Sequence, residues 1–181
     1  MTDQLDLLRY PIGQFEAPEV YTDEQLEEWI KVLEEFPAKL EKLVSALDND
    51  QLNTPYRPGG WTVRQTIHHL ADSHHHSYTR FKWTLTENKP RIKAYFEQEW
   101  AELEDAKFLP IQISLDYLKA IHAKLVATIK SLTDEQLSRS YIHPEGDVEI
   151  NLKKQTGIYA WHSQHHFAHI ANLLGREGWV S

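Results

Sequence analysis

Residues 159–170 read Tyr159-Ala160-Trp161-His162-Ser163-Gln164-His165-His166-Phe167-Ala168-His169-Ile170, and four of these twelve residues are histidine. At about 100° per residue, His162 and His166 lie one turn apart on the same face of a helix. Apolar residues continue this face in both directions, at Leu152, Tyr159, Ile170 and Leu173. Asn151 is a favourable N-cap and Gly175 suits the position after the last turn, so we expect the helix to lie between them.

The histidine pair in this helix has two interpretations. An imidazole inside an apolar face is costly unless it is hydrogen-bonded or bound to a metal. A single pair at this spacing is more often structural, but the chain holds 11 histidines and no cysteine. Any metal site must therefore use nitrogen and oxygen ligands, and imidazole favours zinc or nickel. A third ligand would have to come from another helix.

The composition limits the class of protein. With 181 residues, 41% of them hydrophobic, the chain can bury a real core, and we expect one domain over residues 1–181. The net charge of -8, without a basic patch, argues against nucleic acid as a partner. No run approaches the roughly 18 apolar residues of a membrane span, and the N-terminus does not resemble a signal peptide. The lack of cysteine fits a cytoplasmic location.

A second histidine-rich helix is expected from Val63 to about Thr86. It opens with Thr62-Val63-Arg64-Gln65, a pattern typical of a capping box. His74 lies on its apolar stripe, whereas His69 lies to one side among small side chains. Periodicity alone therefore favours His74 as the residue that points inward. The histidines of this helix are His68, His69, His74, His75 and His76.

Two further helices complete the predicted fold. One opens at Thr22-Asp23-Glu24-Gln25 and runs to about residue 47, and Pro37 should kink or divide it. The other covers about residues 112–131 and places His122 in a packing seam. We expect His122 to be a core histidine with a hydrogen-bond partner, and support of a metal site is the alternative.

The segments between these helices are expected to be irregular. Residues 1–20 should be extended, and residues 87–110 should form a long crossover with a short helix near Trp100. Alternation at Val148, Ile150 and Leu152 indicates a short extended segment before the last helix. Four helices and no strong strand pattern predict an all-α four-helix bundle with long crossover connections.

The two connectors that precede the histidine-bearing helices resemble each other. Leu47-x3-Gln51-Leu52-x3-Tyr56 in the first matches Leu132-x3-Gln136-Leu137-x3-Tyr141 in the second. The match indicates either a weak internal repeat of two helical hairpins or a chance agreement between amphipathic segments, and the sequence alone favours neither.

Longer runs of the chain resemble the DinB/YfiT-like superfamily. The residues that carry the resemblance are Gly59 to His74, Tyr78-x-Arg80-Phe81-Lys82, Leu85-Thr86-Glu87, His143-Pro144 and the Trp161 to Ile170 run. The likeness covers nearly the whole chain and implies a four-helix bundle with a metal ion held by three histidines, which fall on His69, His162 and His166. It also implies one divalent ion, zinc or nickel, per subunit, a homodimer and a cytoplasmic location.

The resemblance changes the choice of ligands made from periodicity. It implies His69, which matches the Trp-x7-His pattern of the family's second helix, in place of His74. This choice is compatible with helix geometry, since a residue at the edge of a packed stripe can face a cavity. His169 remains a rival ligand, since it continues the stripe of His162 and His166. His169 and His122 are candidates to support the metal ligands from behind. His165 is expected on the flank, either exposed or in such a supporting position, and His75 and His76 are expected to be solvated.

The function implied by the resemblance is that of a metal-dependent hydrolase with a small-molecule substrate. Three protein ligands leave zinc an open position, where metal-bound water can serve as the nucleophile. A zincin carries a glutamate directly after its first histidine as the general base, and here that place is Ser163. The candidates for a base elsewhere are His74, His143, Glu145 and Asp72.

Two other functions fit the same ligands. Relatives in the superfamily are metal-dependent S-transferases for low-molecular-weight thiols such as bacillithiol, and a metal with an open position could activate a thiolate without a glutamate base. A non-catalytic metal-binding or sensing role is the alternative from a different class.

Overall fold

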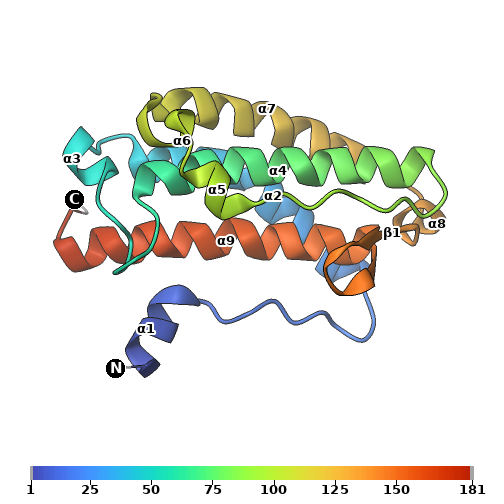
Figure 1. The fold of residues 1–181 in the computed structure, drawn as a ribbon. Helices are drawn as coiled ribbons and strands as arrows, with labels where there is room; N and C mark the ends of the chain where they lie inside the picture. The colour runs from blue at the N-terminus through green and yellow to red at the C-terminus, as the bar shows by residue number, and fades with distance from the viewer. Residues whose placement is uncertain (1, 180–181) are drawn as a thin grey trace.

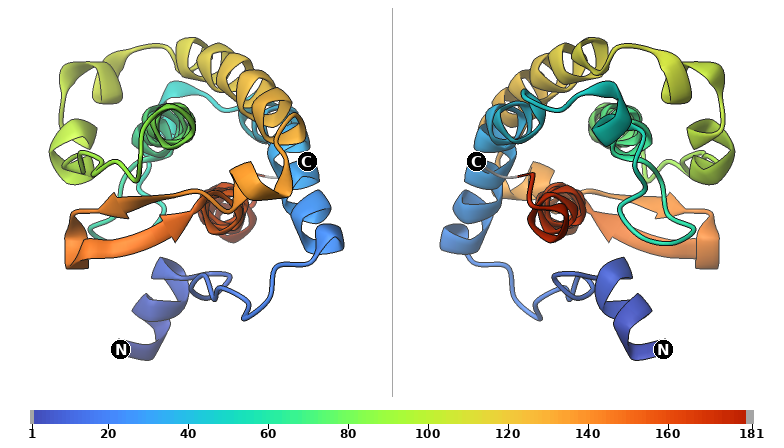
Figure 2. Two further views of the ribbon diagram at one scale, coloured as in Figure 1. Left: turned by 90° about the vertical axis from the view of Figure 1, so that its right-hand side faces the viewer. Right: turned by 90° about the vertical axis from the view of Figure 1, so that its left-hand side faces the viewer.

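The structure is a computed structural model that describes residues 2–179. Its four long helices are α2 (Asp23–Val44), α4 (Val63–Thr86), α7 (Ile111–Lys130) and α9 (Leu152–Glu177). Each long helix packs against two of the others, in the cyclic order α2, α7, α4, α9. Figures 1 and 2 show the bundle from the side and along its axis. The predicted all-α four-helix bundle is confirmed, and none of the described helices is long and apolar enough to cross a membrane.

The apolar core falls into two clusters, one toward each end of the bundle. On α4 the first cluster ends at Ala71 and the second contains Phe81, and on α9 the first contains Ile170 and the second Tyr159. His74, His75 and His76 of α4 and all four histidines of α9 lie between these positions, whereas His68 and His69 lie within the stretch of α4 that contributes to the first cluster. Most of the histidines of α4 and α9 therefore lie between two apolar clusters, and the packing of these clusters fixes the backbone on either side of the histidines.

The ends of the long helices follow the sequence closely. Thr62 and Gln65 form the predicted capping box of α4, and Asn151 caps α9 as expected. Helix α2 continues through Pro37 and is not divided there. The expected end of α9 at Gly175 was wrong. The helix runs on to Glu177, because Gly178, at φ 70°, supplies the left-handed conformation that closes it.

The two similar connectors form two similar structures. Each contains a four-residue helix opened by a capping box, α3 (Asn49–Leu52) in the first and α8 (Asp134–Leu137) in the second. Each is followed by a buried tyrosine, Tyr56 or Tyr141. Matching caps and matching burial favour the internal repeat over chance agreement.

The second connector also contains a small sheet. Strand β1 (Ser140–His143) pairs antiparallel with β2 (Val148–Asn151), and the 3-10 turn Glu145–Asp147 joins them. The extended segment expected from the alternation at residues 148–152 is confirmed as β2, whereas β1 was not predicted.

The long crossover and the N-terminal segment cover the outside of the bundle. The helix expected near Trp100 is α5 (Glu97–Ala101), and a second one, α6 (Glu104–Phe108), follows it. Residues 2–9 form helix α1, so the expectation of an extended lead-in was wrong for them. The helix breakers that suggested it begin only at Pro11. After α1 the chain runs along α9 (Figure 1).

Candidate metal centre

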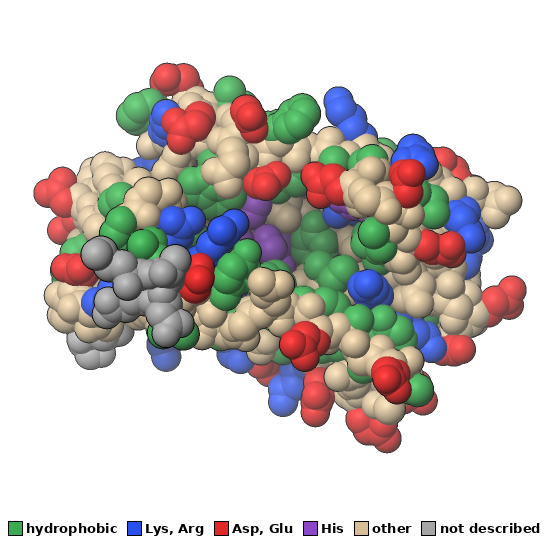
Figure 3. Space-filling model, turned by 60° about the horizontal axis from the view of Figure 1, so that its bottom comes forward, with side chains coloured by type: hydrophobic (Ala, Val, Ile, Leu, Met, Phe, Trp, Pro, Cys, Tyr) green, Lys and Arg blue, Asp and Glu red, His purple; other side chains and the backbone are tan. Residues whose placement is uncertain are grey.

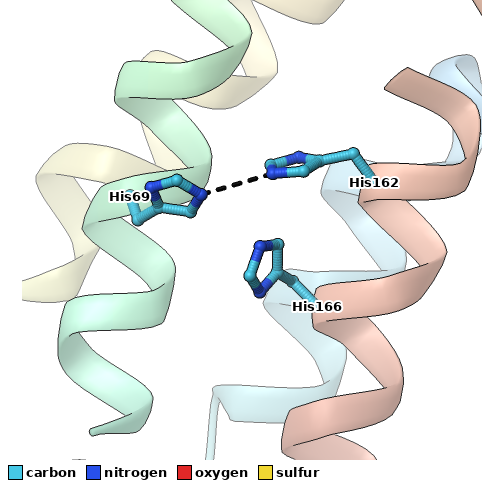
Figure 4. A group of neighbouring side chains, drawn as sticks. All are labelled: His69, His162 and His166. Atoms are coloured by element: carbon cyan, nitrogen blue, oxygen red, sulfur yellow. Dashed lines mark hydrogen bonds between the residues drawn. The ribbon is translucent and has the colours of Figure 1, made fainter. Parts of the chain in front are cut away.

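Three histidines from two helices face one another in the middle of the bundle (Figure 4). His69 comes from α4, and His162 and His166 come from successive turns of α9. One ring nitrogen from each lies within 4.8 Å of the others, a spacing at which the group could hold a metal ion. The Nε2 atoms of His69 and His162 are 3.2 Å apart. Two nitrogens bound to one tetrahedral zinc ion at its usual bond length are roughly 3.3 Å apart.

The three imidazoles are neutral at pH 7. Burial lowers the pKa of His69 to about 3. Burial, followed by the neighbouring histidines, holds the pKa values of His162 and His166 well below the ordinary value. Metal binding requires neutral imidazole, so these residues offer lone pairs without first losing protons.

A series of hydrogen-bonded histidines supports His162 on the side away from His69 and His166. The Nδ1–H of His122 donates to the Leu33 carbonyl oxygen (2.5 Å), because a carbonyl can only accept. The Nε2 of His122 then accepts from His74 Nδ1–H (2.8 Å), and His74 Nε2 accepts from His162 Nδ1–H (3.2 Å). This order of donors leaves the Nε2 of His162 unprotonated and directed at His69.

A shorter series of hydrogen bonds supports His166. The Nε2–H of His169 donates to the Arg9 carbonyl oxygen (3.0 Å), at the end of α1. The Nδ1 of His169 can then accept from His166 Nδ1–H, at 3.3 Å, which leaves Nε2 of His166 with its lone pair. Tyr56 stacks on the His169 ring, with centroids 4.0 Å apart, and fixes its plane.

The third histidine is supported by the crossover. The Nδ1 of His69 lies 3.4 Å from the hydroxyl oxygen of Tyr95, and the Trp61 ring packs against the His69 ring with centroids 4.5 Å apart. All three histidines thus have Nδ1 engaged from behind, and the Nε2 atoms of His69 and His162 contact each other, in the position from which both could bind one ion. Outer hydrogen bonds of this kind orient metal-binding histidines and raise their basicity.

A second group of histidines also lies close together. His165, His166 and His169 have ring nitrogens within 4.8 Å of one another, so the rivalry expected of His169 has a geometric basis. The two groups share His166 and therefore compete for it. His165 is held by stacking on Trp161, and its Nδ1 is buried without a hydrogen-bond partner among the side chains that the structure describes. The first group has better support, because each of its members is hydrogen-bonded from behind.

The first group lines a cavity of about 360 Å³. Figure 3 shows histidine side chains at the bottom of a hollow in the surface, with Lys or Arg side chains beside it. A neighbouring cavity of about 320 Å³ also reaches His162. Other residues that line the first cavity include Arg9, Tyr10, Arg57, Trp61, Arg80, Tyr95, Glu97, Tyr159, His165 and His169.

The candidates for a catalytic base lie in different places. His74 is fully buried and both its ring nitrogens are engaged, which suits support of His162 better than proton transfer. His143 and Glu145 line the neighbouring cavity, with the His143 Nδ1 3.9 Å from a Glu145 carboxylate oxygen. Asp72 lines neither cavity, although burial, followed by the Asp105 charge, raises its pKa to about 6. Ser163 donates its hydroxyl hydrogen to the Tyr159 carbonyl oxygen.

Several residues of the cavity were not predicted to contribute. Tyr95 and Glu97 lie in the crossover, which has no periodic pattern to show which side chains turn inward. Burial of His76 and His165 also exceeds expectation. His76 stacks on Tyr95 with centroids 4.4 Å apart, and burial lowers its pKa to about 4. His165 is only 7% exposed, so of its two expected positions the exposed one was wrong. The exposed position expected of His75 is confirmed.

Comparison with known proteins places the chain among its relatives. It is 49% identical over 172 residues to the "Putative metal-dependent hydrolase YfiT" of Bacillus subtilis (strain 168), which covers 95% of this chain and 97% of that protein. A Bacillus cereus (strain 03BB102) protein of the same description is also 49% identical, over 95% of this chain and 98% of its own length.

Solved structures agree with this relationship. The Bacillus subtilis YfiT structure, described as a probable metal-dependent hydrolase with an unusual four-helix bundle topology, superposes with a TM-score of 0.94 and 48% identity, over 96% of this chain and 99% of that chain. A mycothiol-dependent maleylpyruvate isomerase shares the fold at a TM-score of 0.61 and 16% identity, over 82% of this chain and 60% of that chain. A sequence profile described as the DinB superfamily matches residues 32–170. The chain belongs to the DinB superfamily.

Proposed function

We propose that this protein is a metal-dependent hydrolase of a small molecule and that His69, His162 and His166 hold one divalent ion, zinc or nickel, per chain. The observation that carries the proposal is the set of three neutral imidazoles whose Nε2 atoms converge at the bottom of a cavity. The description of the relatives at 49% identity supports the same activity. When bound, the metal supplies a Lewis acid that activates a nucleophile near neutral pH.

The chain's own residues would have two tasks in hydrolysis. His74, His169 and Tyr95 hold the ligand imidazoles in one tautomer and one orientation. A second group must take a proton from the attacking molecule. Glu97 is the only carboxylate among the described residues that line the cavity of the three histidines, and it lies at the exposed rim. His143 and Glu145 could reach the same point from the neighbouring cavity.

The first test is metal content followed by turnover. Elemental analysis of the protein reloaded with zinc or nickel should give one ion per chain, and the loaded protein should hydrolyse a panel of esters and amides faster than the metal-free protein. Well under half an ion per chain after reloading would contradict the metal site. Full loading with no turnover of any substrate would favour the non-catalytic metal-binding role.

Thiol transfer is a second candidate for the same centre. None of the described carboxylates forms a hydrogen bond with the three histidines, and His74 has no free nitrogen. A thiol needs less help, because binding to a metal lowers its pKa and generates the thiolate. The new bond joins the sulfur to the electrophile, and the leaving group departs with its electron pair while solvent takes the thiol proton.

The two reactions are separated by one assay. If the transferase proposal is right, the metal-loaded protein conjugates a small thiol to an electrophile such as 1-chloro-2,4-dinitrobenzene faster than it hydrolyses simple esters or amides. Metal-dependent hydrolysis with no rate gain from any of several thiols would reject the transferase. His162→Ala should remove either activity, and this variant is the control for a contaminating enzyme.

The resemblance further supports two proposals about the whole molecule, a homodimer and a cytoplasmic location. One chain has a mass of 21.2 kDa, and a dimer should sediment with twice this mass. A single species at the chain mass would contradict it.

A further inference from the structure

Helix α4 contains two buried arginines that differ in their partners. Arg64 is 6% exposed and Arg80 is 8% exposed. The guanidinium of Arg64 donates three hydrogen bonds, to Asn53 Oδ1 (3.1 Å), the Leu109 carbonyl oxygen (3.0 Å) and Asn49 Oδ1 (2.9 Å). These bonds join α4 to the first connector and to the chain after α6, so the side chain of Arg64 has a complete structural role.

The guanidinium of Arg80 has no such set of partners. Within the part of the chain whose side chains are described, residues 5–179, it forms no ion pair, and its one hydrogen-bonding neighbour is the hydroxyl group of Tyr141. The backbone carbonyl of Arg80 accepts from Thr84. An enclosed cation without a counter-ion is costly, because one neutral hydroxyl group replaces only part of the hydration that the cation loses.

The ionisable neighbours of Arg80 do not compensate its charge. Burial raises the pKa of Tyr141, the Arg80 charge opposes this rise, and the Tyr141 hydroxyl donates to Gln155. Burial lowers the pKa values of His143 and His162, and the Arg80 charge lowers them further. These groups are therefore neutral at pH 7, and the positive charge of Arg80 is unbalanced within the fold.

Arg80 is placed where a ligand can reach it. The cavity of the three histidines and the neighbouring cavity share three lining residues, which are Arg80, Tyr159 and His162. Arg9 and Arg57 also line the first cavity, against a single carboxylate from Glu97. A cavity lined in this way attracts anions, and a guanidinium matches an oxyanion with two parallel hydrogen bonds.

We propose that Arg80 binds an oxyanion of the substrate, a carboxylate or a phosphate, beside the metal centre, so that the protein acts on anionic small molecules. This proposal deepens the proposed function by assigning a substrate class to the same site. The oxyanion of the substrate supplies the counter-charge that Arg80 lacks within the fold. Arg80 thereby orients the substrate, so that the part of the substrate away from the oxyanion faces the three histidines.

The test compares an anion with its neutral analogue in the metal-free protein. Binding of butyrate, methyl phosphate and butyramide is measured by saturation-transfer NMR. The wild type should bind at least one anion roughly 10- to 100-fold more tightly than butyramide, as expected for hydrogen bonds between charged groups. Whichever anion binds more tightly identifies the oxyanion. Equal affinity for all three compounds would overturn the proposal without any variant.

Variants then assign the preference to Arg80. Arg80→Met should reduce the ratio of anion to butyramide affinity to within about twofold, and Arg80→Lys should keep part of it. Arg64→Met is the matched control from the same helix, and it should lower the melting temperature but leave the ratio unchanged. If the folded Arg80→Met protein keeps the wild-type ratio, the proposal is wrong.

Two further outcomes are covered by the design. If both Arg80 variants fail to fold, the Nε–H NMR signal of Arg80 in the wild type should shift with the anion and not with butyramide, and an unmoved signal would overturn the proposal. The metal-free measurement is also independent of the proposed reaction. If the protein prefers the anion but takes up no metal when it is reloaded, the hydrolase proposal is rejected and the Arg80 site is kept. If the protein takes up metal but shows no preference for the anion, the Arg80 proposal is rejected and the metal site is kept.

Discussion

Six of the histidines inside the bundle form two sets that use their ring nitrogens differently. His69, His162 and His166 form the inner set, and in each of them Nδ1 has a partner behind it while Nε2 faces the other two rings. His74, His122 and His169 form the outer set, and in each of them both nitrogens are engaged. The residue type is the same in the two sets, and α4 and α9 contribute to both, so a ring nitrogen that faces other inner imidazoles, not the histidine as such, marks the candidate ligand.

Removal of an inner histidine should have the largest effect. Alanine in place of His69, His162 or His166 leaves two ligands, and we expect each variant to lose tight metal binding. Elemental analysis after reloading and gel filtration measures this directly. His75→Ala, on the exposed side of α4, is the control and should keep one ion per chain. An inner variant that also keeps one ion would break the distinction between the sets.

Removal of an outer histidine should have an intermediate effect. Both variants keep the three ligands, but His74→Ala removes the hydrogen-bond partner of His162 Nδ1 and His169→Ala removes that of His166 Nδ1. The loss of such a partner weakens metal binding about 10- to 100-fold. Competition with a chromogenic chelator gives the dissociation constants. If His169→Ala strips the metal while His69→Ala does not, the group of His165, His166 and His169 is the true site.

The smallest effect on metal binding is expected from His122, which touches no inner histidine, and its contribution is instead to the pH dependence of stability. Burial lowers its pKa to about 4, from about 6.5 in the unfolded chain, so the folded state binds fewer protons between these values. Above pH 6.5 the group has no effect on the free energy of unfolding. As the pH falls from 6.5 toward 4, the unfolded chain gains a proton at His122 and the folded chain does not, so the free energy of unfolding decreases by up to about 3 kcal/mol.

The contribution of His122 can be isolated with one variant. Urea unfolding of the metal-free protein at several pH values should show a steeper loss of stability for the wild type than for His122→Gln between pH 6.5 and 4. Parallel curves for the two proteins would show that His122 does not titrate in this window.

The sequence predicted the frame of the site better than its interior. The bounds of α4 followed from the capping box at Thr62 and Gln65, because local hydrogen bonds define a helix start. Periodicity favoured His74 over His69 as the histidine of α4 that points inward, and His74 is indeed fully buried. It could not show that the less buried His69 faces a cavity, because that depends on how closely α4 and α9 approach.

Contacts between distant segments were beyond the sequence patterns. Tyr95 lies behind His69 because the crossover packs along α4, and Arg9 accepts from His169 because α1 returns to α9. The unpaired state of Arg80 is likewise a property of everything around it, and it cannot be recognised without the positions of all nearby carboxylates. Long-range packing therefore decides which polar groups of a bundle are left free.

One measurement tests the central claim most directly, which is nitrogen NMR of the histidine rings in the zinc-loaded wild type. We expect Nε2 of His69, His162 and His166 to show the shift of a metal-bound nitrogen, with Nδ1 of each protonated, and the rings of His165 and His169 to remain unbound. Zinc bound to His165 or His169, or to His166 through Nδ1, would contradict the division into an inner and an outer set.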